Sequence, residues 1–265
     1  MLFDQPGLKA DFLETKPIKA PRSGRGRPGT PFRFSVDVPQ EQPVGIYEYR
    51  VATKTAVSSI AHLMVTDFPV TEEDTKSDNG TFDVAQPIEV PTAIAGTCEK
   101  TEDVDCYKVS AKAGQTITFD IYAQRVTQAV HSMQSGNGTY LMDPILTLMT
   151  STGQVLAQND NHIGGDAFIS YTFAADGEYI ISVRDTRFIG NTKYVYCLEV
   201  SDRPQAHAAF PMAVRRGMVA EVNVVGNNLG DSGTSTIDTS RKDIEKGWQQ
   251  TPLSLSSGET FLSTY

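Results

Sequence analysis

Apolar and polar residues alternate with a period of two along most of the chain, and a sustained helical period is nearly absent. In QTITFDIYA, residues 115–123, the alternation puts Ile117, Phe119 and Ile121 on one face. Successive side chains of a strand point to opposite faces of a sheet, so this pattern is typical of a strand with one buried face. The sequence therefore predicts an all-β protein.

The alternation recurs in GEYIISVRD, which begins at Gly177, and in KYVYCLEV, which begins at Lys193. The residues expected on the buried faces of these two strands are Tyr179, Ile181, Val183, Tyr194, Tyr196, Leu198 and Val200. Shorter strands are predicted in DPILTLMT, GQVLAQN and AFISYTF, because turn residues such as those at 151–153 and 175–177 bound them. Strands this short, with turns about every 8 to 12 residues, favour an antiparallel, jelly-roll-like β-sandwich of two sheets.

Changes of composition predict the joints between domains. Residues 68–91, FPVTEEDTKSDNGTFDVAQPIEVP, are acidic and unpatterned, which indicates a linker that leads into an edge strand. A second break follows at SDRPQAHAAFP, and strand-like segments lie on both flanks in PFRFSVDVP, GIYEYRVAT and GMVAEVNVVGNNL. The stretch from Gly230 onward has little strand character. We expect the end of an Ig-like module at 1–69, a linker at 70–82, a sandwich at 83–201 and a truncated second Ig-like module at 202–265.

Six ordered motifs run through the central segment: D-x-D-x-Y, a-G-q, l-x-D-p-x-L, G-x-x-L-A-x-N-D, D-G-x-Y-x-x-x-V and Y-x-L-x-V. They lie in EDVDCYKVSAKAGQTITFDIYAQRV, DPILTLMTSTGQVLAQNDN, DAFISYTFAADGEYIISVRDTRF and YVYCLEV. On these motifs, residues 78–201 resemble the bacterial pre-peptidase C-terminal domain, a small β-sandwich. The flanks look like the Ig-like pieces that neighbour this domain in large secreted bacterial proteins.

The resemblance implies a noncatalytic extracellular module of a secreted or cell-envelope protein, whose signal peptide would lie upstream of this chain. Such a module would serve as a spacer, as an aid to secretion or folding, or as a binding module. Its neighbours would be other domains of the same polypeptide. One alternative is a calcium-stabilised adhesin, or a module that targets an attached hydrolase to an extracellular protein or polysaccharide.

Calcium is the cofactor that the resemblance implies, because some relatives bind it through an E-x-E-x-N-[ND] linker and aspartates of the D-x-D strand entry. The match is partial: SDNGTF supplies Asp78 and Asn79, but Thr75 and Ser77 stand where the glutamates would be. Three carboxylates upstream, at residues 72–74, can substitute only if the linker loops back.

Calcium takes six to eight oxygen ligands, which two chain segments can supply together. The candidate metal ligands are therefore Asp78, Asn79, Asp103 and Asp105, and the alternative is an acidic loop without an ion.

A second polar set, Asn159, Asp160 and Asp166, lies in a Gly-rich segment, and for these residues a turn is the favoured interpretation. Zinc is disfavoured, because His162 is the only histidine near either polar set.

The tetrapeptide GDSG at residues 230–233 is the sequence that surrounds the nucleophile of chymotrypsin-like proteases. With His62 upstream, a serine protease that uses Ser232 would follow the chain order His, Asp, Ser. Thr234 and Ser235 follow instead of Gly-Pro, and His62 is expected inside a strand. No P-loop, G-x-S-x-G or H-E-x-x-H motif is present, so the sequence predicts no enzymatic activity.

Net charge is −9, and the one basic cluster is Arg22, Arg25 and Arg27, which argues against nucleic acid as a partner. No apolar run approaches the roughly 18 residues of a membrane span. The cysteines, Cys98, Cys106 and Cys197, have neither C-x-x-C spacing nor an even count. Cys106 and Cys197 can pair if their strands are neighbours, and free thiols are the alternative.

Aromatic residues divide into two expected groups. The tyrosines expected in the core are Tyr107, Tyr171, Tyr179, Tyr194 and Tyr196. Tyr122, Tyr140 and Phe188 are candidates for an exposed surface that binds sugar or collagen, because exposed aromatic side chains in loops suit stacking contacts.

Overall fold

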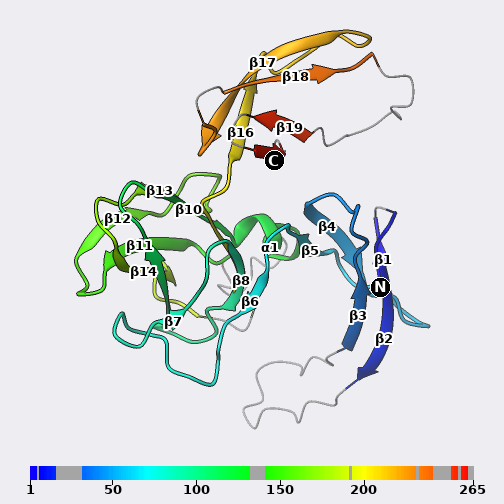
Figure 1. The fold of residues 1–265 in the computed structure, drawn as a ribbon. Helices are drawn as coiled ribbons and strands as arrows, with labels where there is room; N and C mark the ends of the chain where they lie inside the picture. Colours follow the sequence, from blue (N-terminus) through cyan, green and yellow to red (C-terminus); the bar gives the residue numbers. More distant parts are fainter. Residues whose placement is uncertain are drawn as a thin grey trace. The chain divides into compact units, whose positions relative to one another are not determined.

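A computed structural model describes residues 1–4, 6–15, 32–131, 141–190, 193–230, 233–240, 252–255 and 258–261. Almost every element in these residues is a strand, which confirms the all-β prediction (Figure 1). The chain divides into two compact units, one of residues 1–67 with 126–140, and one of residues 68–125 with 141–265. No helix in the described part of the chain is long and apolar enough to cross a membrane.

The first unit contains two small sheets. One has the strand order β1-β4-β5, with β1 (Leu2–Phe3), β4 (Gly45–Arg50) and β5 (Ala61–Val65). The other is the antiparallel pair of β2 (Lys9–Thr15) and β3 (Phe32–Asp37). The strands predicted in PFRFSVDVP and GIYEYRVAT are thus confirmed as β3 and β4.

The second unit is built on two five-stranded sheets. The first sheet has the order β13-β10-β15-β8-β6, with β6 (Val70–Glu72), β8 (Thr92–Thr97), β10 (Thr116–Tyr122), β13 (Phe168–Thr172) and β15 (Val195–Ser201). The second has the order β12-β11-β14-β9-β7, with β7 (Gln86–Pro87), β9 (Val104–Ala111), β11 (Pro144–Thr150), β12 (Val155–Asn159) and β14 (Gly177–Asp185). Neighbouring strands are antiparallel except at one edge of each sheet, where β6 pairs in parallel with β8 and β7 pairs in parallel with β9. The predicted antiparallel sandwich is confirmed.

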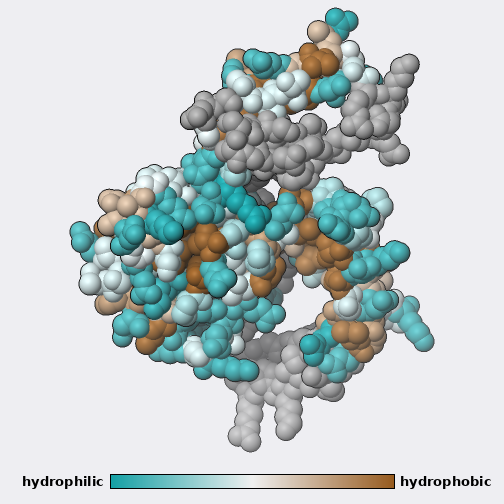
Figure 2. All heavy atoms as spheres, viewed as in Figure 1, coloured by the Kyte–Doolittle hydropathy of each residue, from teal (hydrophilic) through white to brown (hydrophobic). Residues whose placement is uncertain are grey.

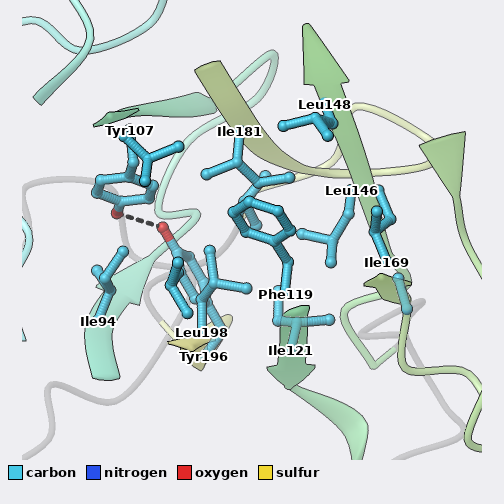
Figure 3. Packing of buried hydrophobic residues seen from close by; sticks show 14 of the residues in the cluster. Ile94, Tyr107, Phe119, Ile121, Leu146, Leu148, Ile169, Ile181, Tyr196 and Leu198 are labelled. Atoms are coloured by element: carbon cyan, nitrogen blue, oxygen red, sulfur yellow. Dashed lines mark hydrogen bonds between the residues drawn. The ribbon is translucent and has the colours of Figure 1, made fainter. Parts of the chain in front are cut away.

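Side chains from both sheets meet in one apolar core (Figure 3). Ile117, Phe119 and Ile121 of β10 are all fully buried, so the alternation predicted their inward face correctly. Every residue predicted on the inner faces of β14 and β15 also belongs to this core or packs against it. The hydroxyls of Tyr107 in the second sheet and Tyr196 in the first lie 2.6 Å apart, so a hydrogen bond joins the two sheets through the core.

Residues 70–87, which we call the strap, border both sheets. Its first strand, β6, lies beside β8, and its second, β7, lies beside β9. Between them, the backbone oxygen of Asn79 accepts a hydrogen bond of 2.9 Å from the backbone N–H of Cys106. Ala85 packs with Cys106 and Ile180 in a small apolar cluster. The segment read as a linker into an edge strand therefore supplies an edge strand to each sheet.

The C-terminal part of this unit holds a three-stranded antiparallel sheet of β16 (Gln205–Phe210), β17 (Val219–Asn227) and β18 (Thr234–Asp238). A hairpin of β19 (Pro252–Leu255) and β20 (Gly258–Phe261) follows. The expectation of little strand character beyond Gly230 was wrong. β18 is a short, polar strand that needs its partner β17 to form, so its own sequence, TSTID, predicts it weakly. The Ig-like character of both flanks stays a prediction.

All three cysteines are free. Cys106 lies in β9 of the second sheet and Cys197 in β15 of the first, so their strands are not neighbours. The pairing that the sequence left open is therefore not formed.

Phe119 tests the core, because its ring is fully buried between the two sheets. Phe119→Ala should lower the free energy of unfolding by about 3–5 kcal/mol, since it removes buried apolar area and leaves a cavity. Urea denaturation followed by fluorescence measures this change. Val155→Ala, at a position whose side chain is 56% exposed, is the matched control and should change stability little. Equal losses in both variants would contradict this account of the core.

Candidate functional site

Asp105 is a carboxyl group placed at the rim of an apolar core. It lies in β9 and is 1% exposed. One of its oxygens, Oδ2, accepts a hydrogen bond of 2.7 Å from the Tyr196 hydroxyl and a longer contact of 3.6 Å from the Cys98 thiol. The other oxygen, Oδ1, is buried without a hydrogen-bond partner. Such a group is costly unless it is protonated or meets a cation.

Glu73, from the strap, lies beside Asp105. Its backbone N–H donates to the oxygen of Ala95 at 3.0 Å, and its carboxylate Oε2 accepts from the backbone N–H of Thr97 at 2.8 Å. Both partners belong to β8, so the parallel pairing of β6 with β8 carries Glu73 to this position. The linker therefore does loop back. This was the condition under which a carboxylate of residues 72–74 could replace one of the missing glutamates.

The pKa values of both carboxyl groups lie above their ordinary values. Burial first, and then the negative charge of Glu73, raise the pKa of Asp105 to about 8. Burial also raises the pKa of Glu73. Near neutral pH the pair therefore retains a proton that two solvated carboxyl groups would have lost. The pKa of the Cys98 thiol is raised by burial and by Asp105, so this cysteine is a poor nucleophile.

Two of the other residues predicted as metal ligands, Asp103 and Asp78, accept hydrogen bonds from nearby backbone N–H groups in turns. Asp103 accepts a hydrogen bond of 2.8 Å from the backbone N–H of Glu99, and the ammonium group of Lys100 lies 3.5 Å from its second oxygen. Asp78 accepts a bond of 3.1 Å from the backbone N–H of Gly80. The amide nitrogen of the Asn79 side chain is buried without a partner.

In the described part of the chain, no three side chains of His, Cys, Asp and Glu are arranged to hold a metal ion as they stand. The ligand set of Asp78, Asn79, Asp103 and Asp105 stays a prediction. Glu73 is the residue that sequence reasoning left conditional, because its place depends on how the strap pairs.

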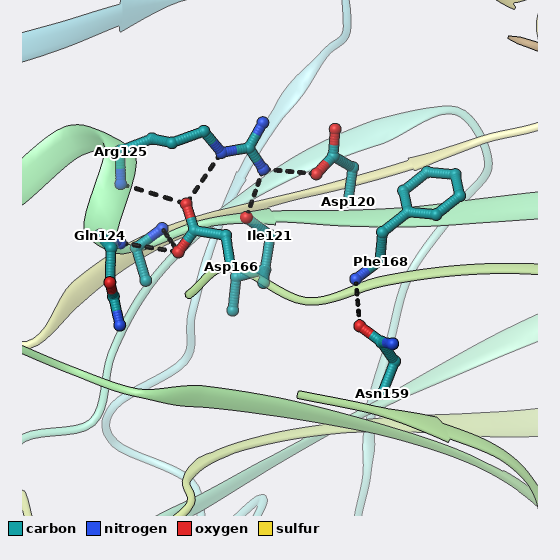
Figure 4. A network of polar contacts seen from close by, with 8 residues as sticks. Asp120, Ile121, Gln124, Arg125, Asn159, Asp166 and Phe168 are labelled. Carbon is teal, nitrogen blue, oxygen red and sulfur yellow. Dashed lines mark hydrogen bonds and ion pairs between the residues drawn. The ribbon is translucent and has the colours of Figure 1, made fainter. Parts of the chain in front are cut away.

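Asp166 organises a second polar cluster (Figure 4). Its Oδ1 accepts hydrogen bonds from the backbone N–H groups of Ala123 and Gln124, at 3.1 and 2.7 Å. Its Oδ2 accepts from the backbone N–H and from Nε of Arg125, and the same guanidinium pairs with buried Asp120. These bonds cap the start of helix α1 (Gln124–His131), which the sequence did not predict.

The turn interpretation of the second polar set is too limited for Asp166, whose partners lie about 40 residues away, as in its bond to Gln124. Asn159 is bonded locally, because its side-chain oxygen accepts from the backbone N–H of Phe168 at 3.0 Å. Asp160 is exposed.

Of the two residues proposed for a serine protease, only His62 lies in the described part of the chain. His62 lies in β5, with its Nδ1 2.9 Å from the backbone oxygen of Val126 and its Nε2 4.0 Å from Glu48. Ser232 lies outside the described residues, as do Arg22, Arg25 and Arg27 of the basic cluster.

Of the aromatic residues proposed for a binding surface, Phe188 is 45% exposed, with the Arg184 guanidinium 4.1 Å from its ring. Tyr122 is buried at the end of β10, where the Arg125 guanidinium covers its ring at 3.7 Å, so the expectation of exposure was wrong. Tyr140 lies outside the described residues. The tyrosines assigned to the core are confirmed there, with Tyr171 and Tyr179 partly buried.

A family model, described as the bacterial pre-peptidase C-terminal domain, matches residues 103–185. The chain contains a bacterial pre-peptidase C-terminal domain. The matched segment runs from the strand entry that holds Asp103 and Asp105 to Asp185 at the end of β14. The resemblance expected from the six motifs is therefore confirmed. A pre-peptidase C-terminal domain is typically a noncatalytic module, and such domains occur in secreted bacterial proteins.

Among curated proteins, the chain is 31% identical over 112 residues to a probable subtilase-type serine protease of Deinococcus radiodurans. This match covers 42% of the chain but only 14% of the relative. Among solved structures, the pre-peptidase C-terminal domain of a Bacillus anthracis collagenase is 17% identical, with a TM-score of 0.33 over 44% of this chain and 94% of that one. PliG of Aeromonas hydrophila, a periplasmic inhibitor of g-type lysozyme, is 19% identical, with a TM-score of 0.29 over 44% and 96%.

The raised pKa of Asp105 predicts how stability changes with pH. In metal-free solution, native Asp105 keeps its proton up to about pH 8, whereas the unfolded chain loses it near the ordinary value of 3.8. Over this window the native state binds more protons, so this group's contribution makes the free energy of unfolding fall as pH rises. Urea midpoints measured in EDTA at a series of pH values test this slope.

Asp105→Asn should flatten the slope, because the amide does not titrate. Glu72→Gln, an exposed neighbour of Glu73 in the strap, is the control and should keep the wild-type slope. If Asp105→Asn and the wild type show the same pH dependence, Asp105 does not titrate in this window.

Proposed function

We propose that this chain is a noncatalytic, extracellular β-sandwich module of a secreted multidomain bacterial protein, one that carries a protease or another hydrolase elsewhere. Its role would be to assist folding or secretion, to space neighbouring domains or to bind an extracellular partner. The family match and the protease in which a similar segment occurs support this assignment.

The observation that carries the proposal is the way the domain uses its buried carboxylates. Asp120, Asp166 and Asp185 are each at most 1% exposed, and each bonds to an arginine of the same domain. A general acid or base must come within hydrogen-bonding reach of a substrate. Carboxylates that are enclosed and paired with arginines hold loops and strand ends together instead.

Asp105 bonds to a tyrosine hydroxyl where these three bond to an arginine, and burial raises its pKa to about 8. A strongly shifted pKa is often a mark of a functional site. The Asp105 carboxyl group is enclosed by the Tyr196 hydroxyl, the Cys98 thiol and the strap, and it is 1% exposed. An organic substrate has no access to such a group, whereas a proton or a small cation does. Asp105 therefore supports ion binding better than acid–base catalysis.

The noncatalytic assignment is tested by treating the full chain with a fluorophosphonate probe and with casein. We expect no labelling and no hydrolysis above those of Ser232→Ala. Labelling of the wild-type chain that Ser232→Ala and His62→Ala both abolish would overturn the assignment and revive the serine protease alternative.

Calcium binding is a second candidate function, favoured by the buried carboxyl group of Asp105 beside that of Glu73. Two adjacent carboxylates with an open lone pair suit a hard cation that prefers oxygen ligands. Glu73 and Asp105 would hold the ion, joined by Asp103, Asp78 and Asn79 from the same two segments. A bound calcium ion would supply the positive charge that lets both carboxyl groups ionise.

The structural effect of the ion would be to fix the strap. Glu73 comes from the strap and Asp105 from the second sheet, so an ion between them ties a segment to the sheet whose edge it borders. Calcium would then couple the order of the strap to the stability of the whole sandwich, because metal binding to the native state alone adds to its folding free energy.

Thermal unfolding of the full chain in millimolar calcium and in EDTA tests this function. Calcium at about 100 times its dissociation constant should add about 2.7 kcal/mol, which corresponds to a rise of about 5–10 °C in the midpoint for a protein of this size. Glu73→Gln and Asp105→Asn should lose the rise, and Glu72→Gln should keep it.

An equal rise in magnesium, or a rise that persists in Asp105→Asn, would contradict a calcium site at this pair. Loss of the calcium effect alone would leave the noncatalytic assignment standing, because the labelling experiment tests that assignment separately.

A further inference from the structure

The connection between β16 and β17, residues 210–219 with the sequence FPMAVRRGMV, exposes an unusual set of apolar side chains. Phe210 is 69% exposed, Met212 93%, Met218 50% and Val219 57%. Figure 2 shows hydrophobic residues beside hydrophilic ones on the segment that contains these strands. Single exposed apolar residues are ordinary on protein surfaces, whereas four in one connection indicate an interaction surface.

The backbone of this connection is held in place. Thr239, just after β18, donates from its hydroxyl to the backbone oxygen of Arg215, at 2.9 Å, and its backbone N–H donates to that of Met218, also at 2.9 Å. Gly217 donates to the oxygen of Thr239 at 3.1 Å and has a φ of +81°, which a glycine adopts without strain. Val214 packs inward against the small core of the sheet. The exposed side chains are therefore presented by an anchored loop.

The charge of this segment differs in sign from that of the chain. Arg215 and Arg216 are both exposed and stand between the two methionines. From Arg203 to Ala220 there are three arginines and one histidine and no aspartate or glutamate, although the whole chain has a net charge of −9. Exposed apolar tips flanked by arginines match a surface that is anionic outside and apolar beneath.

We propose that residues 210–219 bind the surface of a bilayer that contains anionic phospholipids. Phe210, Met212 and Met218 would enter the boundary between headgroups and acyl chains, while the two arginines would pair with lipid phosphates. Aromatic residues, methionine and arginine are also enriched in protein–protein interfaces, so a second copy of the chain is the alternative occupant that the experiment distinguishes. This proposal does not rest on the proposed function, because the loop lies outside the matched residues 103–185.

Sedimentation of the full chain with vesicles tests the proposal. The chain should partition onto vesicles made of equal parts phosphatidylcholine and phosphatidylglycerol, and much less onto pure phosphatidylcholine. Arg215→Gln with Arg216→Gln should weaken partition about fivefold for each arginine. Phe210→Ser with Met212→Ser should weaken it by roughly tenfold or more, because less apolar area enters the bilayer.

Matched controls lie elsewhere on the chain. Lys54→Gln with Lys112→Gln removes two exposed positive charges, and Val225→Ser removes an apolar side chain that is 59% exposed on β17. Both should partition like the wild type, and circular dichroism should show every variant folded. Binding that is absent, equal on both vesicle types, or weakened as much by the controls would overturn the proposal. So would loop variants that lose self-association in analytical ultracentrifugation while vesicle binding is unchanged, because the surface would then join two copies of the chain.

Discussion

A buried carboxyl group needs a hydrogen-bond donor or a cation beside it. In this protein that group is Asp105, and it constrains both sheets because its donor belongs to the opposite sheet. Tyr196 of the first sheet donates to Asp105 of the second, and the Tyr196 hydroxyl is in turn bonded to that of Tyr107. The three residues form a polar line through the apolar core, in a place where an unpaired hydroxyl would be costly. These bonds constrain the register of β9 and β15, because a slip of one residue in either strand would turn its side chain to the opposite face. The packing of the core and the position of the strap depend on the same register.

The sandwich itself could be predicted from local pattern. The alternation in β10, β14 and β15 assigns the inner-face residues correctly because each strand has one face against the same core. The motifs of the pre-peptidase C-terminal domain identify the family for the same reason: they record turn residues and inward side chains in a fixed order. Information of this kind lies within about ten residues of the element it specifies, so a single sequence contains it.

Features that depend on distant partners were missed. Helix α1 begins where it does because Asp166, some 40 residues away, satisfies the first N–H groups of the helix. Glu73 lies beside Asp105 only because a three-residue strand pairs in parallel with β8. Tyr122 lies on the outward face of β10, and its ring is covered by Arg125, whose guanidinium is held in place by Asp166. In each case the deciding contact is between chain segments, which no local periodicity records.

The pairing of β6 with β8 also determines where the polypeptide enters and leaves the sandwich. Val70 at the start of β6 is opposite Ala93, and Val200 near the end of β15 is opposite Thr92, so entry and exit flank the same end of one strand. Two strand spacings separate them, roughly 10 Å. The two ends of the sandwich segment therefore lie close together. A force applied along the chain would reach β6, β8 and β15 before the rest of the core.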